Sequence, residues 1–151
     1  MNVIAIPLDR KRIRVLANSI REIIKELYDG EFKLLDFVEN NLSVLDKEYN
    51  FAVIPIEEMP GVYGRTNASK SELFIREDVY EGIRQENPRD LFTLAHELAH
   101  YLLHGSDKIS FARGNVSIKC DPEWQANTFA SELLKPYFEK LGIDINYVIN
   151  A

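Results

Sequence analysis

The chain has 151 residues, of which 46% are hydrophobic and 28% are charged, fractions close to those of ordinary globular proteins. Together with the single cysteine, these fractions exclude an intrinsically disordered chain, a collagen-like chain and a disulfide-stabilised miniprotein. The formal net charge of −6, from 18 basic and 24 acidic side chains, makes non-specific binding to nucleic acid or to an anionic membrane unfavourable.

The length predicts one domain over residues 1–151, because two domains of ordinary size would need a longer chain. The lone cysteine, Cys120, cannot form a disulfide within the chain, which favours a reducing compartment. No apolar run reaches the ~20 residues of a membrane-spanning helix, and the first residues lack the basic and apolar regions of a signal peptide. We therefore expect a soluble, cytoplasmic protein without a membrane partner.

The N-terminal third of the chain is predicted to form two amphipathic helices. Apolar side chains recur at the 3.6-residue helical period within residues 9–28 and again within about residues 33–45. Six basic and two acidic side chains in residues 1–25 give this segment a positive charge. We assign these bases to the solvated face of the first helix, and we expect no direct binding to nucleic acid.

The next part of the chain is predicted to form a small β-meander followed by a short helix. Residues 51–56 are typical of a short buried strand that ends, or lies at a sheet edge, near Pro55. Residues 61–66 and 71–76 flank a polar turn and predict a β-hairpin. Residues 77–86 are expected to form one short helix.

The C-terminal part is predicted to be helical again. Asn-Pro at 87–88 and Asp-Pro at 121–122 each combine an N-cap residue with a proline at the first helical position. The first of these helices is expected to end at residues 104–105, and the second at Leu134, because Lys-Pro at 135–136 should stop it. A final short helix should end near Gly142. Helices, a small sheet and further helices together predict an α+β fold.

All three histidines of the chain lie within nine residues of the first of these two helices. His96, Glu97 and His100 match the metal-hydrolase pattern HExxH. Two histidines four residues apart lie on the same helix face, with Cβ atoms ~5–6 Å apart, so both imidazoles can bind one zinc ion. Glu97, rotated ~100° around the helix, can accept a proton from a zinc-activated water molecule.

A catalytic zinc site also needs a third protein ligand and one open position. His104 does not fit, because it lies ~12 Å beyond His96 along a straight helix, and we expect it at the helix end or outside the ligands. Glu123 is favoured as the third ligand, since Asn127 follows one turn later on the same face and could support it. A first-turn glutamate that only favours the helix dipole remains an alternative, as does Cys120, which would suit a closed structural site.

Two blocks of the sequence carry a family resemblance. The run FTLAHELAHYLLH at 92–104 and the run EWQANTFASELLKP at 123–136 together resemble the ImmA/IrrE metallopeptidase family. The resemblance covers roughly residues 50–136. It implies a zincin-like α+β core, with His96, His100 and Glu123 as Zn²⁺ ligands and Glu97 as general base.

The resemblance also implies a function. Relatives cleave a protein substrate, usually a helix-turn-helix repressor of a mobile element or a stress regulon, and we expect such a protein partner here. The alternative is a zincin-shaped regulator that binds a repressor or toxin partner without cutting it. Tyr63, Arg65 and Tyr101 are further candidates for stabilising an oxyanion, but we leave them outside the expected catalytic set.

Overall fold

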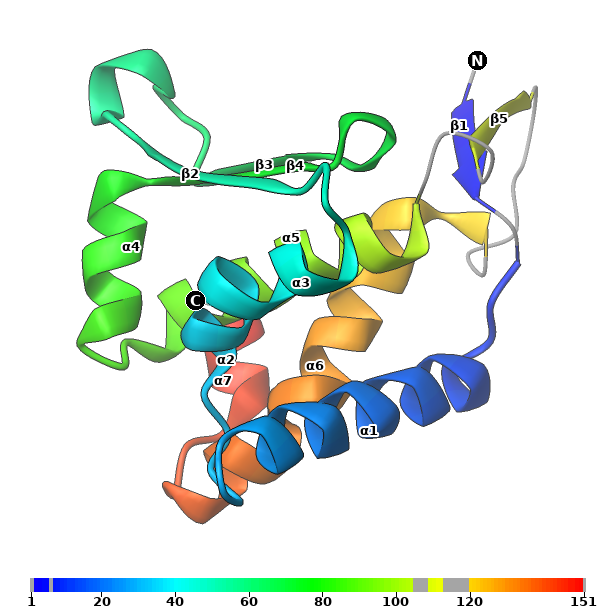
Figure 1. Ribbon diagram of the computed structural model, residues 1–151. Helices are drawn as coiled ribbons and strands as arrows, with labels where there is room; N and C mark the ends of the chain where they lie inside the picture. Colours follow the sequence, from blue (N-terminus) through cyan, green and yellow to red (C-terminus); the bar gives the residue numbers. More distant parts are fainter. Residues whose placement is uncertain (1, 6, 105–108, 113–119, 151) are drawn as a thin grey trace.

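The central element is helix α5 (Pro88–Leu103), which lies between a small sheet and helix α1 (Arg10–Leu27) (Figure 1). The computed structural model describes residues 2–5, 7–104, 109–112 and 120–150. Helix α6 (Pro122–Lys140) packs against both α5 and α1. The mixture of helices and a small sheet confirms the α+β class. None of the helices in the described ranges is long and apolar enough to cross a membrane.

Small side chains allow α5 and α6 to pack closely and form the centre of the core. Alanines stand at buried positions of both helices, next to larger apolar side chains that fill the space between the backbones. The fully buried set comprises Leu94, Ala95, Leu98 and Ala99 of α5 with Ala126, Phe129, Ala130 and Leu133 of α6. The packing therefore fixes the two helices that carry the HExxH pattern and Glu123.

Helix α1 begins where the sequence predicts, because the side chain of Asp9 accepts a hydrogen bond from the backbone nitrogen of Arg12. Its buried stripe is narrower than the apolar pattern suggests. Ile13, Ala17 and Ile24 are fully buried, whereas the expected core residues Leu16, Ile23 and Leu27 are 42%, 41% and 52% exposed.

The second amphipathic segment is helical, as predicted, but it is not one regular α-helix. It comprises α2 (Leu34–Asp36), a π-helical turn (Phe37–Asn41) and α3 (Leu42–Leu45). The side chains of Phe37, Val38 and Leu42 are buried. The extra residue in a π turn shifts the register of the helix face, which the apolar pattern alone does not reveal.

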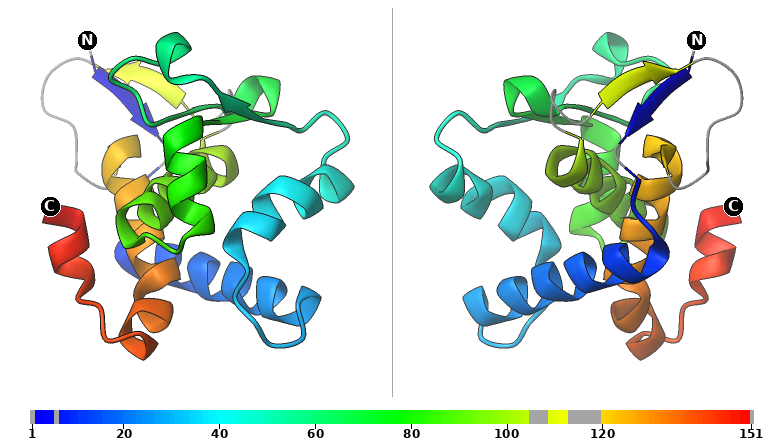
Figure 2. Two further views of the ribbon diagram at one scale, coloured as in Figure 1. Left: turned by 90° about the vertical axis from the view of Figure 1, so that its left-hand side faces the viewer. Right: turned by 90° about the vertical axis from the view of Figure 1, so that its right-hand side faces the viewer.

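The three-stranded sheet corrects the predicted β-meander. Strands β3 (Gly64–Asn67) and β4 (Glu72–Arg76) form the predicted antiparallel hairpin, but β2 (Asn50–Ile54) pairs with β4 in parallel. The order is therefore β2-β4-β3, and the small sheet lies on one side of the helices (Figures 1 and 2). Strand β2 lies at the sheet edge, which Pro55 indicated, but it is partly exposed and not buried. Strand β4 takes the centre because it carries the two fully buried side chains Leu73 and Ile75.

A second pair of strands has no counterpart in the sequence prediction. Strand β1 (Asn2–Ala5) pairs antiparallel with β5 (Ile109–Ala112). The partners are about a hundred residues apart in the chain, so no local pattern indicates the pairing.

The helices flanking the predicted Asn-Pro start signal form as expected. Helix α4 (Glu77–Arg84) follows β4 directly. The Asn87 side chain then accepts hydrogen bonds from the backbone nitrogens of Arg89 and Asp90, which caps α5.

The predicted end of α6 at Leu134 is wrong, because the helix continues through Pro136 to Lys140. A proline has no N–H group, so the carbonyl of Glu132, four residues earlier, loses its partner within the helix. The guanidinium of Arg21 on α1 donates to this carbonyl, and its Nε donates to the carbonyl of Leu133 at 3.2 Å. An external donor therefore replaces the missing backbone bond, and the helix tolerates the proline.

The bases of α1 are accordingly not only a solvated face, as the sequence suggested. Arg10 and Arg14 bind the carboxylate of Glu132 at 3.3 and 2.9 Å. Helix α6 ends at Lys140, and Gly142 follows the C-cap residue with a φ of +74°, which suits glycine. The last helix, α7 (Ile145–Asn150), was not predicted.

Candidate metal centre

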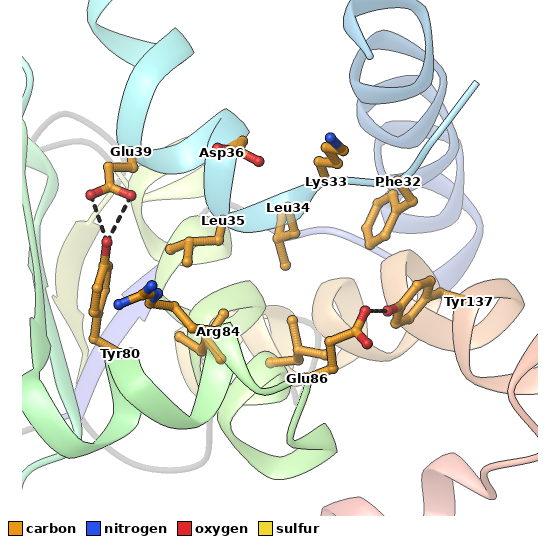
Figure 3. Close-up of a pocket in the computed structure, with 12 residues that line it drawn as sticks. Phe32, Lys33, Leu34, Leu35, Asp36, Glu39, Tyr80, Arg84, Glu86 and Tyr137 are labelled. Carbon is orange, nitrogen blue, oxygen red and sulfur yellow. Dashed lines mark hydrogen bonds between the residues drawn. The ribbon is translucent and has the colours of Figure 1, made fainter. Parts of the chain in front are cut away.

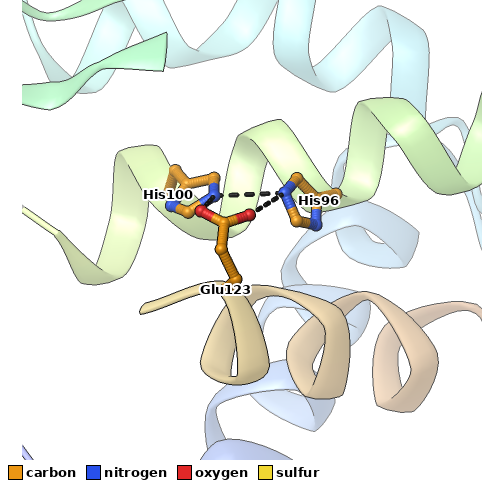
Figure 4. Close-up of side chains that lie close together, drawn as sticks. All are labelled: His96, His100 and Glu123. Carbon is orange, nitrogen blue, oxygen red and sulfur yellow. Dashed lines mark hydrogen bonds and ion pairs between the residues drawn. The ribbon is translucent and has the colours of Figure 1, made fainter. Parts of the chain in front are cut away.

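Helices α5 and α6 bring three side chains together at one point (Figure 4). His96 and His100 are one turn apart on α5, and their Nε2 atoms are 3.1 Å apart. Glu123 lies in the first turn of α6, where the side chain of Asp121 caps the helix. Its Oε1 lies 3.1 Å from His96 Nε2, and its Oε2 lies 3.1 Å from His100 Nε2.

These distances suit a tetrahedral metal ion. Bonds of ~2.0–2.1 Å to zinc place neighbouring ligand atoms of a tetrahedron ~3.3 Å apart, close to the observed 3.1 Å. Within the described ranges, the ligand atoms of His96, His100 and Glu123 form one metal-binding group, all within 4.8 Å of one another. Neither Cys120 nor His104 belongs to this group.

The remaining ring nitrogens of the two histidines are held by other side chains. His96 Nδ1 lies 2.8 Å from Oδ1 of Asn127, and His100 Nδ1 lies 2.9 Å from Nδ1 of His104. Asn127 therefore supports His96, whereas the sequence suggested that it would accompany Glu123. The contacts leave both Nε2 atoms directed at the Glu123 carboxylate, which is the arrangement expected of metal-binding imidazoles.

The electrostatics of the group favour a cation. Hydrogen bonds from His100 and His96 hold the pKa of the Glu123 carboxyl well below its usual range. Burial lowers the pKa of His96, but the hydrogen bond to Glu123 and the charge of Glu97 outweigh it, so that this pKa is raised. Burial lowers the pKa of His104, which favours its neutral form.

Glu97 lies on another face of α5 and is held by β3. Its side chain is buried, and Oε1 accepts a hydrogen bond of 2.7 Å from the hydroxyl of Thr66. The backbone of β3 comes so close that only a glycine fits at position 64. The carboxylate is thus fixed in place while it stays free of the metal-binding group.

A cavity of about 500 Å³ opens beside the histidines. Strand β3 and the turn after it form one wall, and His100 and His104 line the other side. Arg65 of β3 is part of this lining, and its guanidinium lies 5.7 Å from the ring centre of Phe74. A groove therefore runs along β3 to the metal-binding group.

The other two candidates for an oxyanion contact are occupied elsewhere. The hydroxyl of Tyr101 donates to the carboxylate of Asp46. The ring of Tyr63 lies under the guanidinium of Arg76, at 4.7 Å from its centroid. Of the three, only Arg65 lines the cavity beside the histidines.

A separate cavity of about 370 Å³ lies between α2, α4 and α6 (Figure 3). Two of its polar side chains already have partners, since Tyr80 donates to Glu39 and Tyr137 donates to Glu86. No residue of the metal-binding group lines it.

Sequence reasoning missed three residues of the site. Thr66 and Gly64 lie on the hairpin, far from the HExxH pattern in sequence, and nothing local indicates their contact with Glu97. Gln125 does carry a signal, because it is a polar residue on the buried face of α6, where a polar group needs a partner. That partner is His104, whose Nε2 lies 2.7 Å from Oε1 of Gln125.

Comparison with known proteins assigns the chain to a family. Searches of curated proteins and of solved structures find no match. The family model described as the IrrE N-terminal-like domain matches residues 49–144, which include β2 to β4, α5 and all of α6. This chain therefore belongs to the IrrE N-terminal-like peptidase family, peptidase M78.

Proposed function

We propose that this protein is a zinc-dependent endopeptidase that cuts another protein, with His96, His100 and Glu123 as the zinc ligands. The convergence of three side chains carries this proposal: the two Nε2 atoms lie 3.1 Å apart, and each lies 3.1 Å from one oxygen of the Glu123 carboxylate. Three protein ligands leave the fourth position of a tetrahedral zinc open, as in catalytic sites. Membership of a peptidase family supports the same reaction.

When bound, zinc would supply Lewis-acid polarisation of the scissile carbonyl and would lower the pKa of the attacking water. Glu97 then accepts the proton of this water and later donates it to the leaving amine. The hydroxyl of Thr66 holds Oε1 of Glu97 at 2.7 Å, which fixes the orientation of the carboxylate for both transfers. His96 and His100 keep their Nε2 atoms directed at the metal through their contacts to Asn127 and His104.

The substrate is proposed to bind in an extended conformation along β3. This strand ends the three-stranded sheet, where β4 is its one partner among the described strands. An extended peptide can add to such an edge through main-chain hydrogen bonds. The cavity between β3 and the histidines gives room for a substrate side chain next to the reacting bond.

A helix-turn-helix repressor is the proposed substrate, as the resemblance to ImmA/IrrE proteins implies. The test first searches the neighbouring genes for such a repressor and then incubates it with the zinc-loaded wild-type chain and with Glu97→Gln. The amide of the variant keeps the size of the side chain but cannot accept a proton. General acid–base catalysis contributes ~10²–10⁴-fold, so cleavage should fall below detection on a gel while zinc content and repressor binding persist.

A second arm of the test measures repressor relief in cells. Loss of relief with Glu97→Gln supports proteolysis. If this variant keeps its zinc and relieves repression as well as wild type, the protein is a non-proteolytic regulator that binds its partner. Failure of wild-type protein to bind zinc would contradict the proposed metal centre itself.

A further inference from the structure

We propose that His104 and Gln125 are positioning residues that fix the ring orientation and the tautomer of His100, so that its Nε2 stays available to the metal. This inference rests on the proposed zinc site and adds two residues that would act on the ion only through His100. It gives a role to the one histidine of the chain that lies outside the metal-binding group.

Gln125 supplies the acceptor at the end of a series of contacts that runs through His104 to His100. Oε1 of Gln125 lies 2.7 Å from Nε2 of His104. A carbonyl oxygen only accepts hydrogen bonds, so the proton of His104 must lie on Nε2. Nδ1 of a neutral His104 is then an acceptor.

The position of the proton on His104 also determines which ring nitrogen of His100 carries a proton. Its Nδ1 lies 2.9 Å from Nδ1 of His104, and two lone pairs cannot face each other at this distance. His100 must therefore donate from Nδ1. Its Nε2 faces Glu123 and His96, and once a metal ion replaces the proton between Nε2 and Glu123, the lone pair of Nε2 would point at that ion. A metal ion needs this lone pair.

The end of α5 allows the contact between the two histidines. His104 is the C-cap residue, with φ of −124° and ψ of 54°, and its backbone nitrogen still bonds to the carbonyl of His100 at 3.0 Å. Leaving the helix conformation at this residue lets the His104 ring face the His100 ring, with 5.0 Å between the ring centroids.

Burial makes these contacts specific. His104 is 5% exposed and Gln125 is fully buried. Water therefore has little access to replace either contact, and a variant that removes one polar partner takes this hydrogen bond from the other. The shell around metal ligands typically changes metal affinity by ~10–100-fold when it is disrupted.

The first test reads the tautomers directly, by long-range ¹H–¹⁵N NMR of the ¹⁵N-labelled full chain at about pH 8, where free histidines are neutral. His104 should carry its proton on Nε2 with and without zinc, and in the zinc-loaded chain His100 should carry its proton on Nδ1. A proton on Nδ1 of His104 would mean that the Gln125 amide donates to Nε2, and it would overturn the proposal whether or not the protein binds zinc.

The second test measures zinc affinity by competition with a chromogenic chelator. His104→Phe keeps a ring and Gln125→Met keeps the chain length, but neither provides the polar contact. Each should weaken zinc binding by ~10–100-fold, while circular dichroism shows a folded chain. Thr128→Val, which alters another buried polar side chain of α6, is the matched control and should bind zinc like wild type.

The tautomer of His104 in the Gln125→Met variant connects the two tests. Gln125→Met should allow the Nδ1–H tautomer of His104 to appear, because nothing then holds the proton on Nε2. Unchanged zinc affinity and unchanged tautomers in both variants would refute the positioning role and leave the three-ligand site intact. Absence of zinc binding in wild type would instead contradict the proposed function.

Discussion

A Cβ atom on Gly64 would lie 2.8 Å from Cγ of Glu97, closer than real Cβ contacts allow. The strand and the helix are rigid elements, so the side chain of Glu97 has to move if this atom is added. Gly64→Ala should therefore displace the carboxylate of Glu97, the proposed general base, and lower kcat by ~10²-fold. Zinc affinity should remain within about a factor of ten of wild type, because none of the three metal ligands contacts position 64.

The matched control is Gly142→Ala at the end of α6. A φ of +74° at this position strains an alanine, which should cost ~1 kcal/mol of unfolding free energy. The site is far from this turn, so the activity of the folded variant should equal that of wild type. If Gly64→Ala is as active as wild type, the reaction does not depend on the position of the Glu97 carboxylate, and Glu97 is not the base.

Thr66→Val tests the hydrogen bond to Glu97 without a change in side-chain size. The hydroxyl of Thr66 lies 2.7 Å from Oε1 of Glu97, and a hydrogen bond to a charged group contributes ~1.5–3 kcal/mol. The expected loss in kcat is roughly 10-fold or more, with zinc stoichiometry unchanged. Thr66→Ser restores the donor and should recover most of the activity. No difference between valine and serine at this position would exclude the orienting role.

The metal content of purified variants distinguishes the two candidates for the third ligand. Wild-type protein purified without chelator should hold about one zinc per chain, measured by atomic emission. Glu123→Ala should lose most of this zinc, because it removes a ligand. Cys120→Ser should retain it, since Cys120 lies outside the metal-binding group. The reverse pattern would support a closed structural site that contains the cysteine.

The contact of Arg21 with the carbonyls before Pro136 predicts a coupled effect on stability. Arg21→Met leaves the Glu132 carbonyl without its donor and should lower the unfolding free energy by ~1–3 kcal/mol, measured by urea denaturation. In a Pro136→Ala background the new backbone N–H can bind this carbonyl, so the same change should cost less. Arg12→Met, at an exposed base of α1, should stay within about 0.5 kcal/mol of wild type. Equal costs in both backgrounds would rule out this role of Arg21.

The HExxH helix was predictable because its signals are local. The Asn-Pro cap, the apolar period and the four-residue spacing of His96 and His100 all lie within one segment of the chain. Glu123 was favoured for a similar reason, because Asn127 follows it one turn later on the same helix face. That the α5–α6 packing brings Glu123 to the histidines is a tertiary result, which the resemblance to the family implied but no local pattern shows.

The errors arose where distant contacts override local preference. Pro136 continues a helix because Arg21, more than a hundred residues away in sequence, satisfies the carbonyl that the proline frees. Strand β4 lies at the centre of the sheet because it carries the buried side chains Leu73 and Ile75, so β2 pairs with β4 in parallel. A prediction that pairs strands in chain order takes no account of this burial. Thr66 and Gln125 escaped notice because their roles depend on partners in other elements.

One ligand and both amide partners of the histidines come from a single turn and a half of α6, at Glu123, Gln125 and Asn127. Each added or deleted residue turns the following part of a helix by ~100°, so a length change within this stretch would misplace at least one of the three. The other residues of this stretch can therefore be substituted, whereas an insertion or a deletion would disrupt the centre. The spacing between these positions is thus a stricter mark of a working centre than the identity of the residues around them.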